Sequence, residues 1–485
     1  MTALLRAILC FSLWLPALAQ VPAGVQSSSP ALTLAGAVRE ALDRSAEVEA
    51  SARELDLASL EEPLILSNLD PQFLSSYAIT DDRAPRALPA FQGPYSDSQR
   101  WDAGFMQNTL LGTEARLRFA NEKLRNPALF RAFDPSVDSR LSIEINQPLL
   151  RYFWGRPDVA RRRRAGSSVQ QARARLRLAR ESTVIKACAA YLEYYFATEL
   201  VSIKEGGARD AKALVAKYED KKRYGLVEES DLLQARSSLE IQQTELLLAR
   251  SQLERGANAL WAVLLRDGSP PADLRTQFPE ELPEPGQVAE SEALARRADV
   301  EAARARREAL EWNLRVERLD TLPDLRLSLS YSAVGLGSVY DAAWRDMGTF
   351  NHPVRTAGLA VAVPLTFRKE RLVRRQAALQ LERARADERE TAAQAAQDIR
   401  NAKETLQLAR RRTTSAKRLV ELERRKFEAE EANFRRGRSS TDLLLRFQQD
   451  IRRAQTELLR AQTDEALARL DLARAQGDRM EAVFP

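Results

Sequence analysis

The arrangement of apolar and polar residues predicts helices over two unusually long stretches, residues 157–266 and 369–477. Both are rich in Ala, Leu, Arg, Glu and Gln, which favour helices, and neither contains Pro beyond its first residue. Each is interrupted once by a Gly-centred turn, at Gly225 and at Gly437. Up to these glycines each helix spans about 67 residues, or roughly 100 Å at 1.5 Å per residue. A globular core cannot enclose such rods, so we expect coiled coils or the walls of a tube.

Shorter segments alternate between apolar and polar residues, which predicts strands. They are residues 72–79 and 141–149 in the first half and 325–331 and 359–363 in the second, and a further alternating pair lies within 101–119. Tilted strands that cross a bilayer need about 9–11 residues, which these segments approach. Four strands cannot close a barrel, whereas three copies of the chain would supply about twelve. The pattern leaves open whether residues 101–119 add strands or decorate a loop.

The sequence repeats itself internally. Residues 41–50 align without a gap with residues 293–302, and the same offset carries Pro71 onto Pro323. We therefore expect two repeats, each with a helix, strands, a long helix, a Gly turn and a final helix. The predicted divisions are a first repeat at 20–268 with strands at about 71–150, a Pro-rich linker at 269–287, and a second repeat at 288–485 with strands at about 323–366.

The amino terminus is typical of a secretory signal peptide, cleaved before Gln20. Residues 1–19 contain Arg6, then an apolar run too short to span a bilayer, and end in a small-x-small motif. Cys10 lies in the apolar run without the small neighbour that a lipoprotein site requires, so no lipid anchor is expected. After cleavage only Cys188 remains, and the exported chain can form no internal disulfide.

Composition excludes several classes of chemistry. The 485 residues include one His and two Cys, which argues against most zinc, haem, iron–sulfur and His-triad sites. Adjacent carboxylates such as Glu228 and Glu229 fall on exposed helix ends, with nothing to make them an acid/base couple. The net charge of +6 is too dilute over this length to indicate nucleic acid. We predict no enzyme, no cofactor and no metal site.

Several short motifs occur in a fixed order in the two halves. They are Leu32-Thr33-Leu34, Gln147-Pro148-Leu149-Leu150-Arg151, Leu322-Pro323-Asp324-Leu325, Val363-Pro364-Leu365, and the Gly turns followed by Asp231-Leu232-Leu233 and Asp442-Leu443-Leu444. In this order, behind a signal peptide, the motifs resemble the TolC-type outer-membrane efflux channel family over nearly the whole mature chain.

The resemblance implies a mainly α fold with β structure and an internal two-fold repeat. A homotrimer would form a twelve-stranded transmembrane β-barrel in the outer membrane of a Gram-negative cell, above a long α-helical coiled-coil barrel that crosses the periplasm. Its partners would be outer-membrane lipid, a periplasmic adaptor (membrane fusion protein) and an inner-membrane pump of the resistance–nodulation–division or ABC type. The protein would be the passive exit duct, because no energy-coupling motif is present in the sequence.

The resemblance also assigns roles to the two Gly turns. Tyr224-Gly225-Leu226 and Arg436-Gly437-Arg438 would be tips on which the adaptor docks. Asp442 would be a pore-lining carboxylate, Phe434 and the pair Ser230-Asp231 would latch the closed state, and Arg438 would be the latch arginine. The family's second pore carboxylate is replaced by Leu445. A single ring of carboxylates predicts a weakly cation-preferring aperture.

Alternatives accompany these assignments. The glycines can simply end helices, and Ser230-Asp231 and Thr441-Asp442 can cap the helices that follow. Arg161 to Arg164 can meet lipid head groups or form a solvated helix face. Trp101, Trp154 and Trp344 can form an aromatic girdle or pack ordinarily, and His352 is placed in an outer loop. For the whole protein, the alternatives are the outer duct of a type I protein secretion system and a secreted coiled-coil adaptor or scaffold.

Overall fold

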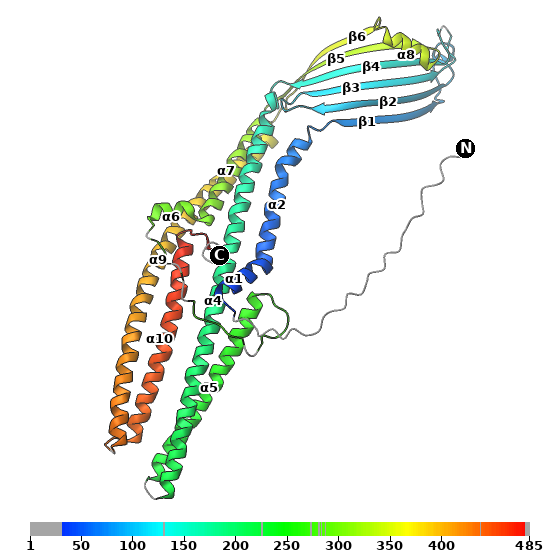
Figure 1. Ribbon diagram of the computed structural model, residues 1–485. Coiled ribbons are helices and arrows are strands. Elements are labelled where there is room, and N and C mark those ends of the chain that lie inside the picture. The colour runs from blue at the N-terminus through cyan, green and yellow to red at the C-terminus, as the bar shows by residue number, and fades with distance from the viewer. Residues whose placement is uncertain are drawn as a thin grey trace, which may run out of the picture.

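The computed structural model describes residues 32–480, except positions 130, 225, 226, 272, 273, 280, 281, 283, 287 and 437. The predicted signal peptide, residues 1–19, lies outside the described residues. The described chain is a long rod of helices with one β-sheet at its end (Figure 1). The chain exposes 31557 Å² of surface, whereas a compact monomer of this mass would expose about 18,000 Å². Much surface is therefore left for other molecules to cover.

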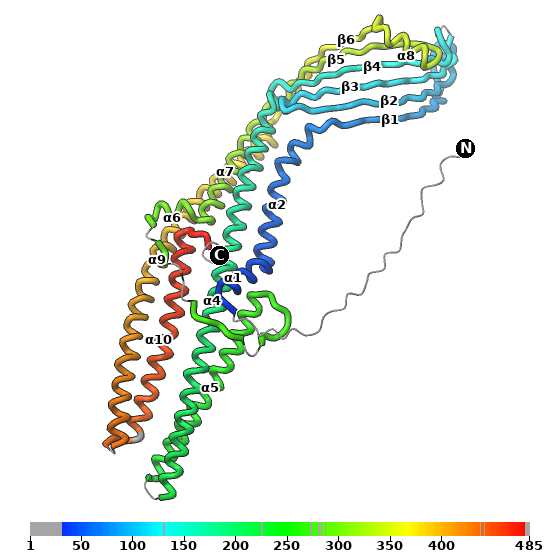
Figure 2. The backbone as a smooth tube through the Cα atoms, in the orientation of Figure 1, coloured from blue at the N-terminus to red at the C-terminus, as the bar shows by residue number. Residues whose placement is uncertain are grey.

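Two helical hairpins form the lower part of the rod. The first hairpin joins α4 (Arg156–Arg223) to α5 (Glu229–Val263), and the second joins α9 (Arg368–Arg435) to α10 (Thr441–Ala475). The two long helices have 68 residues each and the two returning helices have 35 each. Figure 2 shows α4 running unbroken from the sheet to the far tip. Both tips point away from the sheet (Figure 1).

A second pair of helical segments flanks the upper part of the rod. These are α1 (Leu34–Arg44) with α2 (Ala46–Ser67), and α6 (Glu290–Arg296) with α7 (Ala298–Asp320). Thr33 and Ser45 accept hydrogen bonds from Gly36 N and Val48 N, at 3.1 and 3.3 Å, and so cap α1 and α2. Among the described residues, no helix is both long and apolar enough to cross a membrane.

The sheet contains six antiparallel strands, in the order of the chain. They are β1 (Gln72–Asp82), β2 (Ser96–Asn108), β3 (Glu114–Arg125), β4 (Ser136–Pro148), β5 (Asp324–Gly337) and β6 (Pro353–Ala362). Short helices lie in the connections: α3 (Pro89–Gln92), η1 (Phe153–Gly155) and α8 (Tyr340–Gly348).

The strand count corrects the expectation of four strands for each chain. Residues 101–119 fall in β2 and β3, which pair with each other and with β1 and β4 on their outer sides. The alternating pattern on both sides of the Leu111-Gly112 turn is therefore strand structure within the main sheet. Three copies of this sheet would supply eighteen strands instead of twelve.

The main hydrophobic core lies midway along the rod, where α1, α4, α5 and α10 meet. Val38, Tyr191, Leu260 and Leu470 are almost completely buried there. The Tyr191 hydroxyl lies 2.9 Å from the carbonyl oxygens of Leu32 and Gln277, so it ties the segment before α1 to the linker. This core fixes α1 against both hairpins.

Candidate functional site

The candidate site is the inter-hairpin seam, which we define as the contacts between the first hairpin (α4, α5) and the second hairpin (α9, α10). Helix pairs of this kind can slide or separate as bodies if the contacts between them are few and polar. Contacts within each hairpin are dense along its whole length, whereas those across the seam are sparse. The seam is thus the weaker of the two interfaces and the place where the tips can part.

At the tips, a hydrogen bond between side chains crosses the seam. Gln234 Nε2 in α5 donates to Asp442 Oδ1 in α10 at 2.8 Å. Arg446, one turn further along α10, places Nη2 3.9 Å from Asp442 Oδ2. The Asp442 side chain remains 60% exposed, so the predicted pore carboxylate is in contact with water and accompanied by a cation. Arg446 offsets part of the negative charge that a ring of Asp442 carboxylates would present.

Phe434 supplies an apolar contact across the seam. It extends from α9 and packs against a cluster on the first hairpin, formed by Val215, Tyr218, Leu232 and Ala235. Lys221 Nζ lies 6.0 Å from the centre of the Phe434 ring, at the limit of a cation–π contact. The residue predicted as a latch therefore lies where it can hold one hairpin to the other.

The remaining predicted latch residues are placed differently. Ser230 Oγ lies 3.3 Å from Glu228 Oε2 within its own turn, and Asp231 is in the first turn of α5. Arg438 is exposed, and its backbone N–H donates to Asn433 O at 3.0 Å. Among the described residues, no hydrogen bond joins the side chains of Ser230, Asp231 or Arg438 to the opposite hairpin. A latching role for these three stays a prediction.

The helix caps differ from those expected. The N-cap of α5 is Glu228, without a side-chain capping bond, and the N-cap of α10 is Ser440, whose Oγ accepts from Leu443 N at 3.4 Å. The helices begin earlier than expected, so Ser230 and Asp442 are the second residues of α5 and α10. Capping therefore does not account for Asp231 or Asp442.

The predicted docking tips are only partly described. Gly225, Leu226 and Gly437 lie outside the described residues. Tyr224 is 78% exposed, and Arg436 and Arg438 are exposed as well. These side chains are available to a partner, and docking remains a prediction. Leu445, at the position of the family's second carboxylate, is buried at 7% exposure and belongs to the helix packing.

Further up the seam, two arginines of α10 contact acidic residues of α4. Arg460 Nη1 lies 2.8 Å from Glu193 Oε2, and Arg452 forms an ion pair with Asp210 and donates to Ile203 O at 3.3 Å. Sequence reasoning did not identify these residues. The partners are some 240 or more positions apart, and Arg and Glu are so frequent in both helices that no single one stands out.

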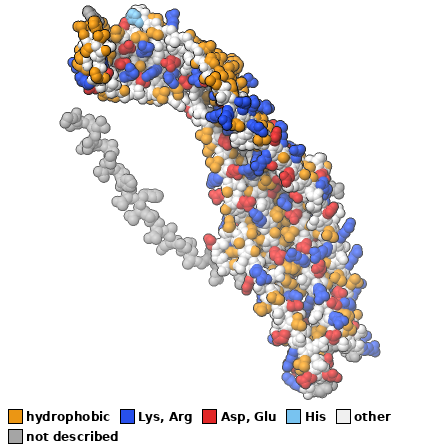
Figure 3. Space-filling view, turned by 180° about the vertical axis from the view of Figure 1, so that it is seen from behind, with side chains coloured by type: hydrophobic (Ala, Val, Ile, Leu, Met, Phe, Trp, Pro, Cys, Tyr) orange, Lys and Arg blue, Asp and Glu red, His pale blue; other side chains and the backbone are white. Residues whose placement is uncertain are grey.

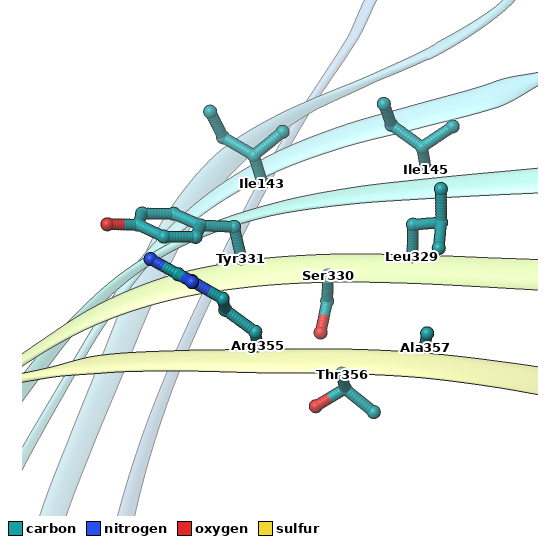
Figure 4. Close-up of a pocket in the computed structure, with 8 residues that line it drawn as sticks. All are labelled: Ile143, Ile145, Leu329, Ser330, Tyr331, Arg355, Thr356 and Ala357. Atoms are coloured by element: carbon teal, nitrogen blue, oxygen red, sulfur yellow. The ribbon is translucent and has the colours of Figure 1, made fainter.

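The two faces of the sheet have opposite character. Side chains that share one face through the strand pairing are apolar and exposed: Phe73, Tyr77, Phe105, Leu117, Ile143, Leu329 and Leu359. Figure 4 shows part of this apolar face, where Ile143, Ile145, Leu329 and Tyr331 point to one side and Ser330 and Thr356 to the other.

The other face, which we call the polar face, carries cross-strand ion pairs. Arg100 lies 2.7 Å from Glu122, and Arg118 lies 2.9 Å from Asp102, which also accepts a hydrogen bond from Ser76 at 2.6 Å. Figure 3, seen from behind, shows basic and acidic side chains gathered over the sheet. The exposed apolar face therefore needs a cover of lipid or protein, whereas the polar face can meet water.

The other sequence candidates have structural partners. Trp101 and Trp344 both pack on Phe119, and Trp344 Nε1 donates to Asn121 Oδ1 at 2.7 Å. Trp154 is 57% exposed beside Phe153. His352 lies near the carboxylate of Asp346, at 3.6 Å.

The basic run at the start of α4 is partly neutralised. Arg161 pairs with Asp158 and Asp320, Arg162 pairs with Glu62, and Arg164 donates to Asn313 Oδ1. Within the described part of the chain, no group of three His, Cys, Asp or Glu side chains is arranged to hold a metal ion.

Part of the chain resembles a known protein family. Residues 290–478 match the family model described as outer membrane efflux protein, and no curated protein sequence matches the chain. The CmeC outer membrane channel of Campylobacter jejuni is 17% identical with a TM-score of 0.68, over 92% of this chain and 85% of that one. VceC of Vibrio cholerae is 17% identical with a TM-score of 0.64, over 92% and 96%.

A further match is the open state of the MtrE outer membrane channel of Neisseria gonorrhoeae, 16% identical with a TM-score of 0.66, over 92% of this chain and 89% of that one. The similarity extends over nearly all of both chains, so it includes the sheet and both hairpins. Residues 290–478 thus match the model of the outer membrane efflux protein family, and the whole chain shares the fold of these outer membrane channels.

Proposed function

We propose that three copies of this chain form a passive duct across the outer membrane and the periplasm. Solutes would be driven into it by an inner-membrane pump of the resistance–nodulation–division or ABC type, through an adaptor docked on the hairpin tips. The mature chain would begin at Gln20 and carry no lipid anchor. The observation that carries the proposal is the sheet, because its exposed apolar face is backed by a charged face, the arrangement of a barrel wall between lipid and water.

The open edges of the sheet support assembly. In the described chain, β1 pairs only with β2 and β6 only with β5, so each has one edge without a partner strand. Nearly all residues of both strands are exposed. Unpaired edges in a membrane leave N–H and C=O groups without water, at a cost of several kcal/mol for each group. Pairing β6 of one copy with β1 of the next removes these edges and closes a cylinder.

The helices also leave apolar surface uncovered. Leu60 and Leu64 on α2 are 52% and 66% exposed, Leu247 on α5 is 69% exposed, and Leu408 and Leu422 on α9 are 67% and 63% exposed. Exposed leucines on several faces of a rod favour contacts with further copies, as in the wall of a tube. The homotrimer of the family accounts for them.

The seam would be the gate of the duct. With both tips at the end opposite the sheet, parting of the hairpins would widen the mouth that faces the pump. Phe434 and the Gln234–Asp442 hydrogen bond would hold that mouth closed. Asp442 would line it and give a weak preference for cations.

Two duct hypotheses differ only in cargo: efflux of drugs or metals, and type I secretion of proteins. The fold is compatible with both. A coiled-coil scaffold is not favoured, because scaffolds do not need a sheet with one face exposed to lipid.

Assembly of the mature protein tests the proposal. The full chain is expressed with its signal peptide, and the mature protein is extracted from the outer-membrane fraction with detergent. Its mass is then measured by light scattering, with the detergent contribution subtracted. We expect a stable complex of three copies, found only with detergent or lipid. A water-soluble monomer would refute the proposal.

A further inference from the structure

The first half of the chain contains a β-hairpin that the second half lacks. β1 begins at position 72 and β5 begins 252 positions later, at 324. The same difference of 252 positions separates the start of α2 from the start of α7. The long helix follows 84 positions later in the first half, at Arg156, and 44 positions later in the second half, at Arg368. The extra length of about 40 residues corresponds to β2, β3 and their connections. β1 and β4 thus match β5 and β6, and β2–β3 is an insertion.

The insertion is part of the sheet and not an outer loop. Eleven residue pairs align β1 with β2, from Gln72–Met106 to Asp82–Ser96, and eleven align β3 with β4. On the polar face, Ser76 of β1 donates to Asp102 of β2, and Arg116 of β3 lies 4.0 Å from Glu144 of β4. The apolar and polar faces continue through the insertion without a change of side.

The turn of the insertion is seated on the start of the long helix. A Cβ at Gly155 would lie 1.8 Å from the carbonyl oxygen of Leu110, and a Cβ at Gly112 would lie 2.7 Å from the carbonyl oxygen of Tyr152. Both glycines have positive φ angles, +64° and +77°. Asn108 Nδ2 also donates to Asn68 O at 3.1 Å, next to the end of α2. The turn is therefore fitted to the junction between sheet and helices.

We infer that three copies of this chain close an eighteen-stranded barrel in which β6 of each copy pairs with β1 of the next. The inference rests on the trimeric duct proposed above, and it adds the number of strands and the diameter of the barrel. At a strand spacing of about 4.8 Å and a tilt of about 40°, the backbone diameter increases from about 24 Å for twelve strands to about 36 Å for eighteen. Inward side chains reduce the lumen below this backbone diameter in both cases, and the eighteen-stranded exit is the wider of the two.

Cysteine cross-linking tests the strand order in the assembled protein. Three double variants are treated with a short bis-maleimide in outer-membrane vesicles: Tyr77→Cys with Trp101→Cys for β1–β2, Leu117→Cys with Ile143→Cys for β3–β4, and Phe73→Cys with Val361→Cys for β1–β6. The native Cys188 is fully buried and the pKa of its thiol is raised to about 12, so it does not react.

All three variants are expected to cross-link, the first two within one chain and the third between chains. If β1–β6 cross-links between chains but β1–β2 or β3–β4 does not, the eighteen-stranded barrel is wrong and the trimeric duct stands. If β1–β6 does not cross-link and the protein is monomeric, both are wrong.

A deletion tests the width. Replacing residues 83–135 by a short turn leaves β1 antiparallel to β4, because two strands are removed together. Polyethylene glycols of increasing size are added to the side of the bilayer that faces the strand loops, and the largest polymer that still lowers single-channel conductance is determined. We expect this size to fall by about a third in the deletion variant, in proportion to the diameter. The matched control removes only loop residues 84–93, which keeps six strands and the full width. Equal sizes in the wild type and the deletion variant would overturn the inference.

Discussion

Gln234 Nε2 lies 2.8 Å from Asp442 Oδ1, and this hydrogen bond joins two residues that are 208 positions apart in the chain. It connects the second turn of α5 with the first turn of α10, near the free ends of the two hairpins. Its partners are exposed, so water competes with it and its contribution to stability is modest. Contacts of this strength suit a closure that must open when a partner binds.

Replacing Gln234 by Leu removes the donor at nearly constant volume and leaves the charge of the tip unchanged. The loss of one exposed hydrogen bond is expected to favour the open mouth by about 1 kcal/mol, or about fivefold in the ratio of open to closed states. Open probability in a planar bilayer measures the effect. Glu229→Gln is the control, because Glu229 pairs with Lys222 inside its own hairpin. Equal open probabilities for Gln234→Leu and wild type would exclude the hydrogen bond from the closure.

The charges at the mouth predict opposite effects on ion selectivity. Asp442→Ala removes the carboxylate and should shift the reversal potential in a salt gradient toward anions and weaken block by divalent cations. Arg446→Ala removes the neighbouring cation, 3.9 Å from that carboxylate, and should increase cation preference. Unchanged reversal potential and divalent block in Asp442→Ala would show that Asp442 does not line the pore.

The ion pair between Arg460 and Glu193 allows a charge exchange. Arg460→Glu and Glu193→Arg should each raise open probability, because each places like charges about 3 Å apart across the seam. The double variant restores the attraction and should return close to wild type. The side chains are 42% and 45% exposed, so the coupling between the two sites should be about 0.5 kcal/mol. Additive effects of the two substitutions would show that this pair does not hold the seam.

Glu40 in α1 predicts a dependence of stability on pH. Arg266 donates to Glu40 through Nε at 2.6 Å and Nη2 at 2.5 Å, and these hydrogen bonds hold the pKa of the Glu40 carboxyl below its usual value. A carboxyl with a lowered pKa stabilises the folded state above its ordinary pKa of about 4.3, and the contribution is lost as the pH falls through the lowered value.

Glu40→Gln should therefore lower the free energy of unfolding by about 1–3 kcal/mol at pH 7. The difference from wild type should shrink below pH 4. Thermal unfolding of the detergent-solubilised complex at pH 7 and pH 3.5 measures it. A Tm difference that stays constant between these two pH values would contradict the pairing. Glu47→Gln, in an exposed pair with Lys186, is the control with a small effect at either pH.

The helical part of the fold is accessible from the sequence because its signals are local. Long runs almost free of Pro, each with one Gly-centred turn, predict two hairpins, and the alignment of Pro71 with Pro323 predicts where the strands begin. The strand count was not predicted, since alternation over a dozen residues with charged members such as Arg116 and Arg118 resembles a polar loop. Pairing with β2 and β4 supplies the information that a single segment lacks.

The candidate site is less accessible because its contacts are long-range. Asp442 and Phe434 were proposed by resemblance, and the structure places both at the seam. Gln234 has no sequence signal: an exposed Gln in a helix is ordinary, and only the approach of the second hairpin gives it a partner. The same holds for Arg460.

Single-channel recording of the purified mature protein in a planar bilayer tests the central proposal most directly. A trimer enclosing an aqueous lumen predicts discrete current steps of uniform size, with Asp442→Ala altering selectivity and Gln234→Leu altering open time. A purified trimer that inserts into the bilayer and passes no current, in the wild type and in the Gln234→Leu variant alike, would contradict the account.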